Sequence, residues 1–156
     1  MHTETRQGTY TQDVQFVIDS LLYNVSLVGV AVNSMCRSLS LPQVGAYQIE
    51  LCVVEAVTNA IKHAYNNQPG FSVQVNFAVH CDKLVITVCD EGRAMPALVV
   101  PSLDFNPADL EHLPEGGMGL FLMHRIMDEV TYVSQHGKNV LTMTKRLPPR
   151  WGEASY

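Results

Sequence analysis

Residues 55–65 (EAVTNAIKHAY) decide how this chain is expected to fold, because they combine an apolar helical face with a stripe of dissimilar polar groups. At about 3.6 residues per turn, the stripe falls within an arc of roughly 100°. Its members, at positions i, i+4, i+7, i+8 and i+11, are Glu55, Asn59, Lys62, His63 and Asn66. The opposite face is expected to join the core through Ile49, Val53, Ala56, Val57, Ala60 and Ala64.

Most helices turn their polar stripe to water, so a solvated surface is the alternative interpretation. This stripe differs from such a surface because it holds a carboxylate, an amide, an ammonium and an imidazole rather than repeated Lys and Glu. It also lies between apolar strands and a glycine-rich segment downstream. We therefore interpret the helix as one wall of a candidate functional site.

The hydrophobic pattern around this helix predicts an α+β fold. Helices are expected over 22–39, 44–65 and 117–127, and strands over 14–19, 71–79, 84–89, 129–134 and 140–147. The strand at 71–79 alternates cleanly, with Phe71, Val73, Val75, Phe77 and Val79 on one face. The expected architecture is a two-layer α/β sandwich, with a mostly antiparallel sheet and three main helices on one face. We expect one domain over residues 1–156, with its core at about 14–147.

Composition and charge narrow the class of protein. The chain has 156 residues, 47% hydrophobic and 16% charged, which is typical of a globular domain. A net charge of −5 argues against direct, nonspecific binding to nucleic acid, which needs a basic surface. The start lacks the order of a signal peptide, and the longest apolar stretch, 21–32, is too short to span a bilayer. We expect no membrane association.

The cysteines point to a reducing compartment. Four are present, and no two form a CxxC pair: Cys36, Cys52, Cys81 and Cys89. Each lies in an apolar pattern, so we expect buried, reduced thiols in a cytoplasmic protein.

Two further segments carry residues suited to ligand binding. Residues 90–96 (DEGRAMP) follow an apolar strand, so Asp90 can present an acceptor while Gly92 lets backbone approach closely; an ordinary strand-end turn is the alternative. In residues 114–122 (PEGGMGLFL), three glycines lead into a helix whose exposed N–H groups can cradle an anion, or simply cap the helix. The spacing is neither that of a Walker loop nor GxGxxG. The long connection over 91–115 has the character of a lid.

In this order, the segments EAVTNAIKH, DEGRAMP and EGGMGLFLMHRIMDEV resemble the N, G1 and G2 boxes of the superfamily of gyrase, heat-shock chaperone, histidine kinase and MutL ATPases, which shares the Bergerat fold. Within it the chain is most similar to the bacterial anti-sigma-factor serine/threonine kinases of the stress-response and sporulation type. The resemblance covers about 14–147 and includes the terminal strand LTMTKRL. It implies a histidine-kinase-like ATPase domain that uses ATP and Mg²⁺.

The resemblance also implies residue roles. Glu55 matches the catalytic glutamate that acts as general base, Asn59 the asparagine that holds Mg²⁺, and Asp90 the aspartate that accepts the adenine amino group. Residues 97–116 match the lid. Nucleotide contacts are further implied for Lys62, His63, Gly92, Ala94, Gly116, Gly117, Met118, Gly119 and Leu120. Ala94 departs from the usual second glycine of DxGxG, and no Lys or Arg lies between Pro96 and Met123.

The function implied by the resemblance is a cytoplasmic switch kinase. It phosphorylates a small anti-anti-sigma (antagonist) protein, sequesters a sigma factor or comparable target in the alternate complex, and works as a homodimer through its N-terminal strand and first helix. Ala94 and the lid composition motivate an alternative, a catalytically weak nucleotide-binding module that exchanges protein partners. A third possibility is the detached catalytic domain of a histidine kinase, although the sequence shows no helix pair with a phosphoacceptor histidine.

Overall fold

A computed structural model of the chain describes residues 12–96 and 118–148. Its strands form one sheet in the order β1-β2-β3-β5-β4, and every neighbouring pair is antiparallel. The strands are β1 (Gln12–Asp19), β2 (Ser72–Val79), β3 (Lys83–Asp90), β4 (Glu129–Gln135) and β5 (Lys138–Arg146). The expected strands are therefore present, each with bounds within two residues of the prediction.

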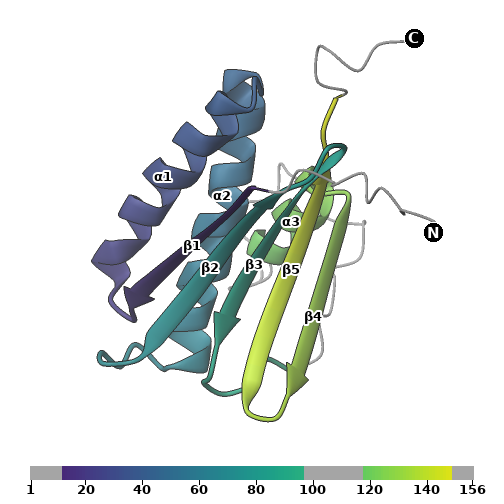
Figure 1. Cartoon of the computed structure of the whole chain (residues 1–156). Helices are drawn as coiled ribbons and strands as arrows, with labels where there is room; N and C mark the ends of the chain where they lie inside the picture. The colour runs from purple at the N-terminus through teal and green to yellow at the C-terminus, as the bar shows by residue number, and fades with distance from the viewer. Residues whose placement is uncertain (1–11, 97–117, 149–156) are drawn as a thin grey trace, which may run out of the picture.

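Three helices lie on one face of this sheet (Figure 1). They are α1 (Val25–Ser38), α2 (Gln43–Asn59) and α3 (Met118–Ile126), and a short 3₁₀ turn, η1 (Leu22–Asn24), precedes α1. This arrangement confirms the predicted α+β sandwich. Helix α2 lies against both α1 and α3, so it forms the middle of the helical layer.

The core lies between the helices and the sheet. Alternate residues of β2 and β3 point into it, and the intervening residues are half-buried on the other face. The fully buried residues include Val73, Phe77, Ile86 and, from α2, Val53. Phe71 was expected to join this row, but the prediction is wrong: its side chain is 49% exposed. It lies before the first residue of β2 and stacks on Tyr65, with ring centroids 4.8 Å apart.

The end of the central helix also differs from the prediction of one continuous α-helix. A π-helical segment, η2 (Ala60–Ala64), follows α2, and the N–H of Tyr65 bonds to the carbonyl of Ala60, five residues back. The Tyr65 hydroxyl donates to the carbonyl of Ser72 and accepts from the N–H of Glu91. A widened turn of this kind is often found beside a functional site.

The thiols are only partly as expected. All four cysteines are free, and Cys36 and Cys52 are buried, which raises the pKa of each thiol to about 12. Cys89 is half-buried, however, and Cys81 is exposed because it lies in the turn between β2 and β3. Within the described ranges, no helix combines the length and the apolar character that crossing a membrane requires.

Candidate nucleotide-binding site

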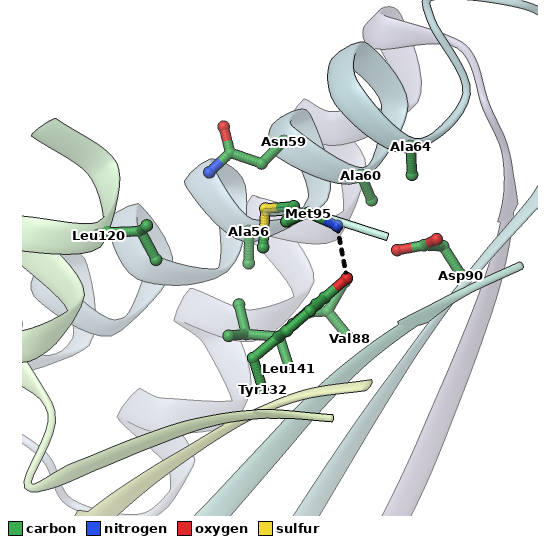
Figure 2. Close-up of a pocket in the computed structure, with 10 residues that line it drawn as sticks. All are labelled: Ala56, Asn59, Ala60, Ala64, Val88, Asp90, Met95, Leu120, Tyr132 and Leu141. Atoms are coloured by element: carbon green, nitrogen blue, oxygen red, sulfur yellow. Dashed lines mark hydrogen bonds between the residues drawn. The ribbon is translucent and has the colours of Figure 1, made fainter. Parts of the chain in front are cut away.

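A pocket opens between the helical layer and the end of the sheet where β3 stops (Figure 2). Helix α2 and η2 form one wall, the inner face of the sheet the floor, and α3 and the segment after β3 the sides. Its lining residues are Ala56, Asn59, Ala60, Ala64, Val88, Asp90, Met95, Leu120, Tyr132 and Leu141. The cavity measures about 20 Å³, room for about one water molecule, so a planar ring can enter only if this lining opens.

Asp90 is the buried acid of this pocket, with 9% of its surface exposed. Its Oδ1 accepts hydrogen bonds from the N–H of Gly92 at 3.0 Å and from Nδ2 of Asn139 at 2.7 Å. Among the described residues no hydrogen bond reaches Oδ2, and Figure 2 shows the carboxylate pointing toward Ala60 and Ala64. Burial raises the pKa of Asp90, and the two hydrogen bonds partly oppose that rise. Within residues 12–96 and 118–148, the site therefore offers one carboxylate oxygen to which no protein donor is bonded.

The backbone that follows Asp90 is held by hydrogen bonds to several elements. The N–H of Glu91 bonds to the Tyr65 hydroxyl, that of Arg93 to the carbonyl of Ala64, and that of Met95 to the Tyr132 hydroxyl. Figure 2 draws the last of these, at 2.9 Å. These tethers fix the segment that begins the predicted lid.

Gly92 is required by this close approach. A Cβ atom at this position would lie 2.4 Å from the carbonyl oxygen of Ala64, closer than any real contact of that kind. The glycine thus lets the segment after β3 pass directly against the end of η2. This agrees with the sequence-based reason for a glycine beside Asp90.

The other end of the site brings Glu55 against the start of α3. A Cβ atom at Gly119 would lie 2.7 Å from Oε2 of Glu55, so the carboxylate rests where only a glycine leaves room. Asn59, one helical turn further along α2, lines the pocket. The structure therefore places Glu55, Asn59 and Gly119 at one end and Asp90 with Gly92 at the other.

The remaining candidate residues fall into three groups. Leu120 lines the pocket, whereas Lys62, His63 and Ala94 are exposed and do not line it. Met118 begins α3. Gly116, Gly117 and the lid proposed over 97–116 lie outside the described residues.

Sequence reasoning missed Tyr132, Ser134 and Asn139. A signal was available for two of them, because residues 139, 141 and 143 alternate inward along β5 and residues 130 and 132 do so along β4. Asn139 is thus a polar residue at a core-facing position, and it is 2% exposed. Ser134 lies opposite it in the register of the two strands.

The donor set fits a ligand that brings its own anionic oxygens. In the two described stretches of chain, no group of three or more His, Cys, Asp or Glu side chains is placed to hold a metal ion. A single amide oxygen from Asn59 suits Mg²⁺, which keeps several waters and is bound largely through substrate phosphates. The buried acceptor of Asp90 suits an amino group on a planar ring.

Comparisons with known proteins agree with this geometry. Residues 18–145 match the family model described as the histidine kinase-like ATPase domain. Serine-protein kinase RsbW of Bacillus velezensis is 34% identical over 127 residues, covering 79% of this chain and 78% of that protein. Serine-protein kinase RsbW of Bacillus subtilis is 38% identical over 103 residues, 64% of this chain and 63% of that protein, which is just under two thirds of its length.

The fold is also found among solved structures. The crystal structure of the RsbU and RsbW domains of Rv1364c from Mycobacterium tuberculosis superposes with a TM-score of 0.62 at 15% identity. The match covers 89% of this chain and 34% of that chain. At this level of identity the similarity is one of fold.

Proposed function

Because the chain belongs to the histidine kinase-like ATPase domain family, and within it to the serine-protein kinases, we propose that it acts as the kinase of a partner-switching system. In this proposal it binds ATP with Mg²⁺ and phosphorylates a serine or threonine of a small anti-anti-sigma (antagonist) protein. In the alternate complex it sequesters a sigma factor or a comparable target. The proposed place of action is the cytoplasm.

The proposal rests on the carboxylate of Asp90, because only one of its two oxygens accepts hydrogen bonds from the described residues. Oδ1 accepts two hydrogen bonds from protein donors, whereas Oδ2 accepts none from the described residues. An adenine amino group is a donor of the matching kind. Burial opposes ionisation of this carboxylate in spite of its two hydrogen bonds, so a further donor from a ligand is expected to stabilise the ionised form.

The proposed chemistry needs positioning and charge neutralisation more than covalent participation. Glu55 is the general base that accepts the proton of the attacking hydroxyl, and its place on α2 is one helical turn before Asn59, the proposed Mg²⁺ ligand. Asn59 holds Mg²⁺, which when bound neutralises charge on the phosphates. Gly119, in the first turn of α3, offers its backbone N–H group to the phosphates.

The test is transfer of label from [γ-³²P]ATP to the antagonist by wild type, Glu55→Gln and a matched control, Glu50→Gln. Glu50 also lies on α2, but it accepts a hydrogen bond from Asn33 on α1, away from the pocket. Loss of a general base lowers the transfer rate by roughly 10²–10⁴-fold, and the control keeps it. Transfer that survives in Glu55→Gln contradicts the base assignment. Acid-stable label indicates a hydroxyl ester, whereas acid-labile label indicates phosphohistidine and a histidine-kinase-like reaction.

A second candidate is a nucleotide-binding module that exchanges partners without phosphoryl transfer. It is favoured by the absence of any Lys or Arg between Pro96 and Met123, where a cation would stabilise the phosphates. In the same assay, nucleotide binding by wild type without any transfer to the antagonist supports this module instead of the kinase.

A homodimer is part of the proposal, and exposed apolar side chains support it. Tyr23, Leu27 and Val30, which lie on one side of η1 and α1 at spacings of i, i+4 and i+7, are 72%, 67% and 63% exposed. Val17 on the edge strand β1 is 62% exposed. Exposed apolar side chains gathered on one side of a helix are typical of interaction sites. Leu27→Asp is expected to shift sedimentation from dimer to monomer; an unchanged dimer places the contact elsewhere.

A further inference from the structure

Asn139 connects the outermost strand of the sheet to the pocket. It lies on β5 directly opposite Asp90 on β3 and opposite Ser134 on β4. Its Nδ2 donates to Oδ1 of Asp90 at 2.7 Å and to the carbonyl of Gly92 at 3.0 Å. Its Oδ1 accepts from the Ser134 hydroxyl at 2.7 Å. Both amide hydrogens therefore go to the segment at the end of β3, and the oxygen goes to the edge strand β4.

These partners allow only one orientation of the amide. If its oxygen and nitrogen were exchanged, the oxygen would face two acceptors, the Asp90 carboxylate and the Gly92 carbonyl. In the observed orientation the Ser134 hydroxyl satisfies the amide oxygen. The position of Oδ1 of Asp90 is thus fixed from β5 and from the N–H of Gly92, and Asp90 itself lines the pocket.

We propose that Asn139, held in place by Ser134, is a positioning residue that keeps Asp90 oriented and ionised for the amino group of the nucleotide base. The inference rests on the proposed binding of ATP. It assigns to the hairpin of β4 and β5 a part in nucleotide affinity, although Ser134 and Asn139 do not line the pocket.

The charge of Asp90 explains why Asn139 is expected to affect nucleotide binding. Burial favours the neutral acid at Asp90, and the Asn139 amide is the larger of the two hydrogen-bond contributions that lower its pKa. The titratable neighbours do not supply a positive charge. Tyr65 and Cys89 have raised pKa values and stay neutral, and Glu91 beside Tyr65 is acidic. Lys138 lowers the pKa of Cys89 but is not among the groups that shift the pKa of Asp90. Removing the amide is therefore expected to raise the pKa of Asp90, so that acid abolishes binding at a higher pH.

The experiment is calorimetric titration of the full chain with ADP from about pH 5 to about pH 8, for wild type, Asn139→Leu and Asn76→Leu. Asn76 is the matched control, because its Nδ2 also donates to a neighbouring strand, to Thr87 Oγ1 at 2.9 Å, but on the face of the sheet away from the pocket. Asn139→Leu is expected to weaken ADP binding roughly 10- to 100-fold near neutral pH. It is also expected to move the acid limb, which is the fall in ADP affinity at low pH, to a higher pH. Asn76→Leu is expected to change neither.

Wild-type affinity and an unmoved acid limb in Asn139→Leu overturn the inference, as does an equal effect of Asn76→Leu. If Asn139→Leu does not fold, the nearly isosteric Asn139→Asp replaces it. The added carboxylate is expected to move the acid limb upward, and an unmoved limb overturns the inference equally. Absence of ADP binding by folded wild type is a different result, because it removes the proposed function itself.

Discussion

Two buried polar clusters lie at the same end of the sheet, one around Ser20 after β1 and one around Asp90 at the end of β3. The Ser20 hydroxyl donates to the carbonyl of Gln68 and accepts from the N–H of Phe71. The backbone N–H of Ser20 bonds to the carbonyl of Phe71 and to Oδ1 of Asp19. Around Asp90, by contrast, Oδ2 receives no hydrogen bond from the described residues, and burial raises the pKa of the carboxyl.

The difference separates a structural role from a binding role. The Ser20 cluster joins the turn between β1 and α1 to the start of β2, and its hydrogen-bonding groups bind one another. In the Asp90 cluster one carboxylate oxygen has no hydrogen bond from the described residues, and burial raises the pKa of the carboxyl, which is typical of a site prepared for a ligand. Three substitutions test this contrast.

The largest effect is expected from Gly92→Ala, which breaks the Asp90 cluster. The added methyl group overlaps the carbonyl of Ala64, so the segment must move away from η2. We expect a loss of about 3 kcal/mol in the free energy of unfolding, together with loss of nucleotide binding. Urea unfolding and calorimetry measure the two quantities. The control is Gly45→Ala, where the nearest atom to the new methyl is 3.8 Å away; equal stability of both variants contradicts the close approach.

An intermediate effect is expected from Ser20→Ala, which removes the hydroxyl at the centre of the Ser20 cluster. It leaves the carbonyl of Gln68 and the N–H of Phe71 without their hydroxyl partner, so unfolding becomes easier by about 1–2 kcal/mol. Nucleotide affinity is expected to stay at the wild-type value. Ser38→Ala removes an exposed hydroxyl that also bonds to a carbonyl, and serves as the control. A fall in affinity with Ser20→Ala would erase the distinction between the clusters.

The smallest effect is expected on the pH dependence of stability in Asp90→Asn. The folded pKa of Asp90 lies above its ordinary value of 3.8, so the folded state holds the proton more tightly than the unfolded chain. Wild-type stability from this group is therefore present below that value and is lost as pH rises through the folded pKa. In the variant, the amide at position 90 does not titrate, so the contribution of this residue to stability does not fall as pH rises. Its melting temperature relative to wild type should rise with pH across this window; a difference independent of pH contradicts the raised pKa.

The sequence predicts the architecture well because burial follows simple periods. The alternation of Val73, Val75 and Phe77 is by itself enough to identify a half-buried strand. Helical spacing makes Glu55 and Asn59 candidates, and the position after an apolar strand beside Gly92 adds Asp90. The structure brings Asn59 and Asp90 to one pocket, with Glu55 against Gly119.

What could not be predicted depends on contacts between distant segments. The π-helical turn at 60–64 leaves the Tyr65 hydroxyl between β2 and the residue after Asp90, and no local propensity signals it. That change of helical register accompanies the exposure of Lys62 and His63, which the regular helix placed in the polar stripe. Phe71 fits the strand alternation but lies outside the strand, where stacking on Tyr65 replaces burial.

The most direct test of the account is calorimetric titration of folded wild type and Asp90→Asn with ATP, with and without Mg²⁺. The account predicts magnesium-dependent binding by wild type and an affinity roughly 10- to 100-fold lower in Asp90→Asn, whose fold is at least as stable at neutral pH. Equal affinity in the two proteins, or no uptake of ATP by folded wild type, would contradict it.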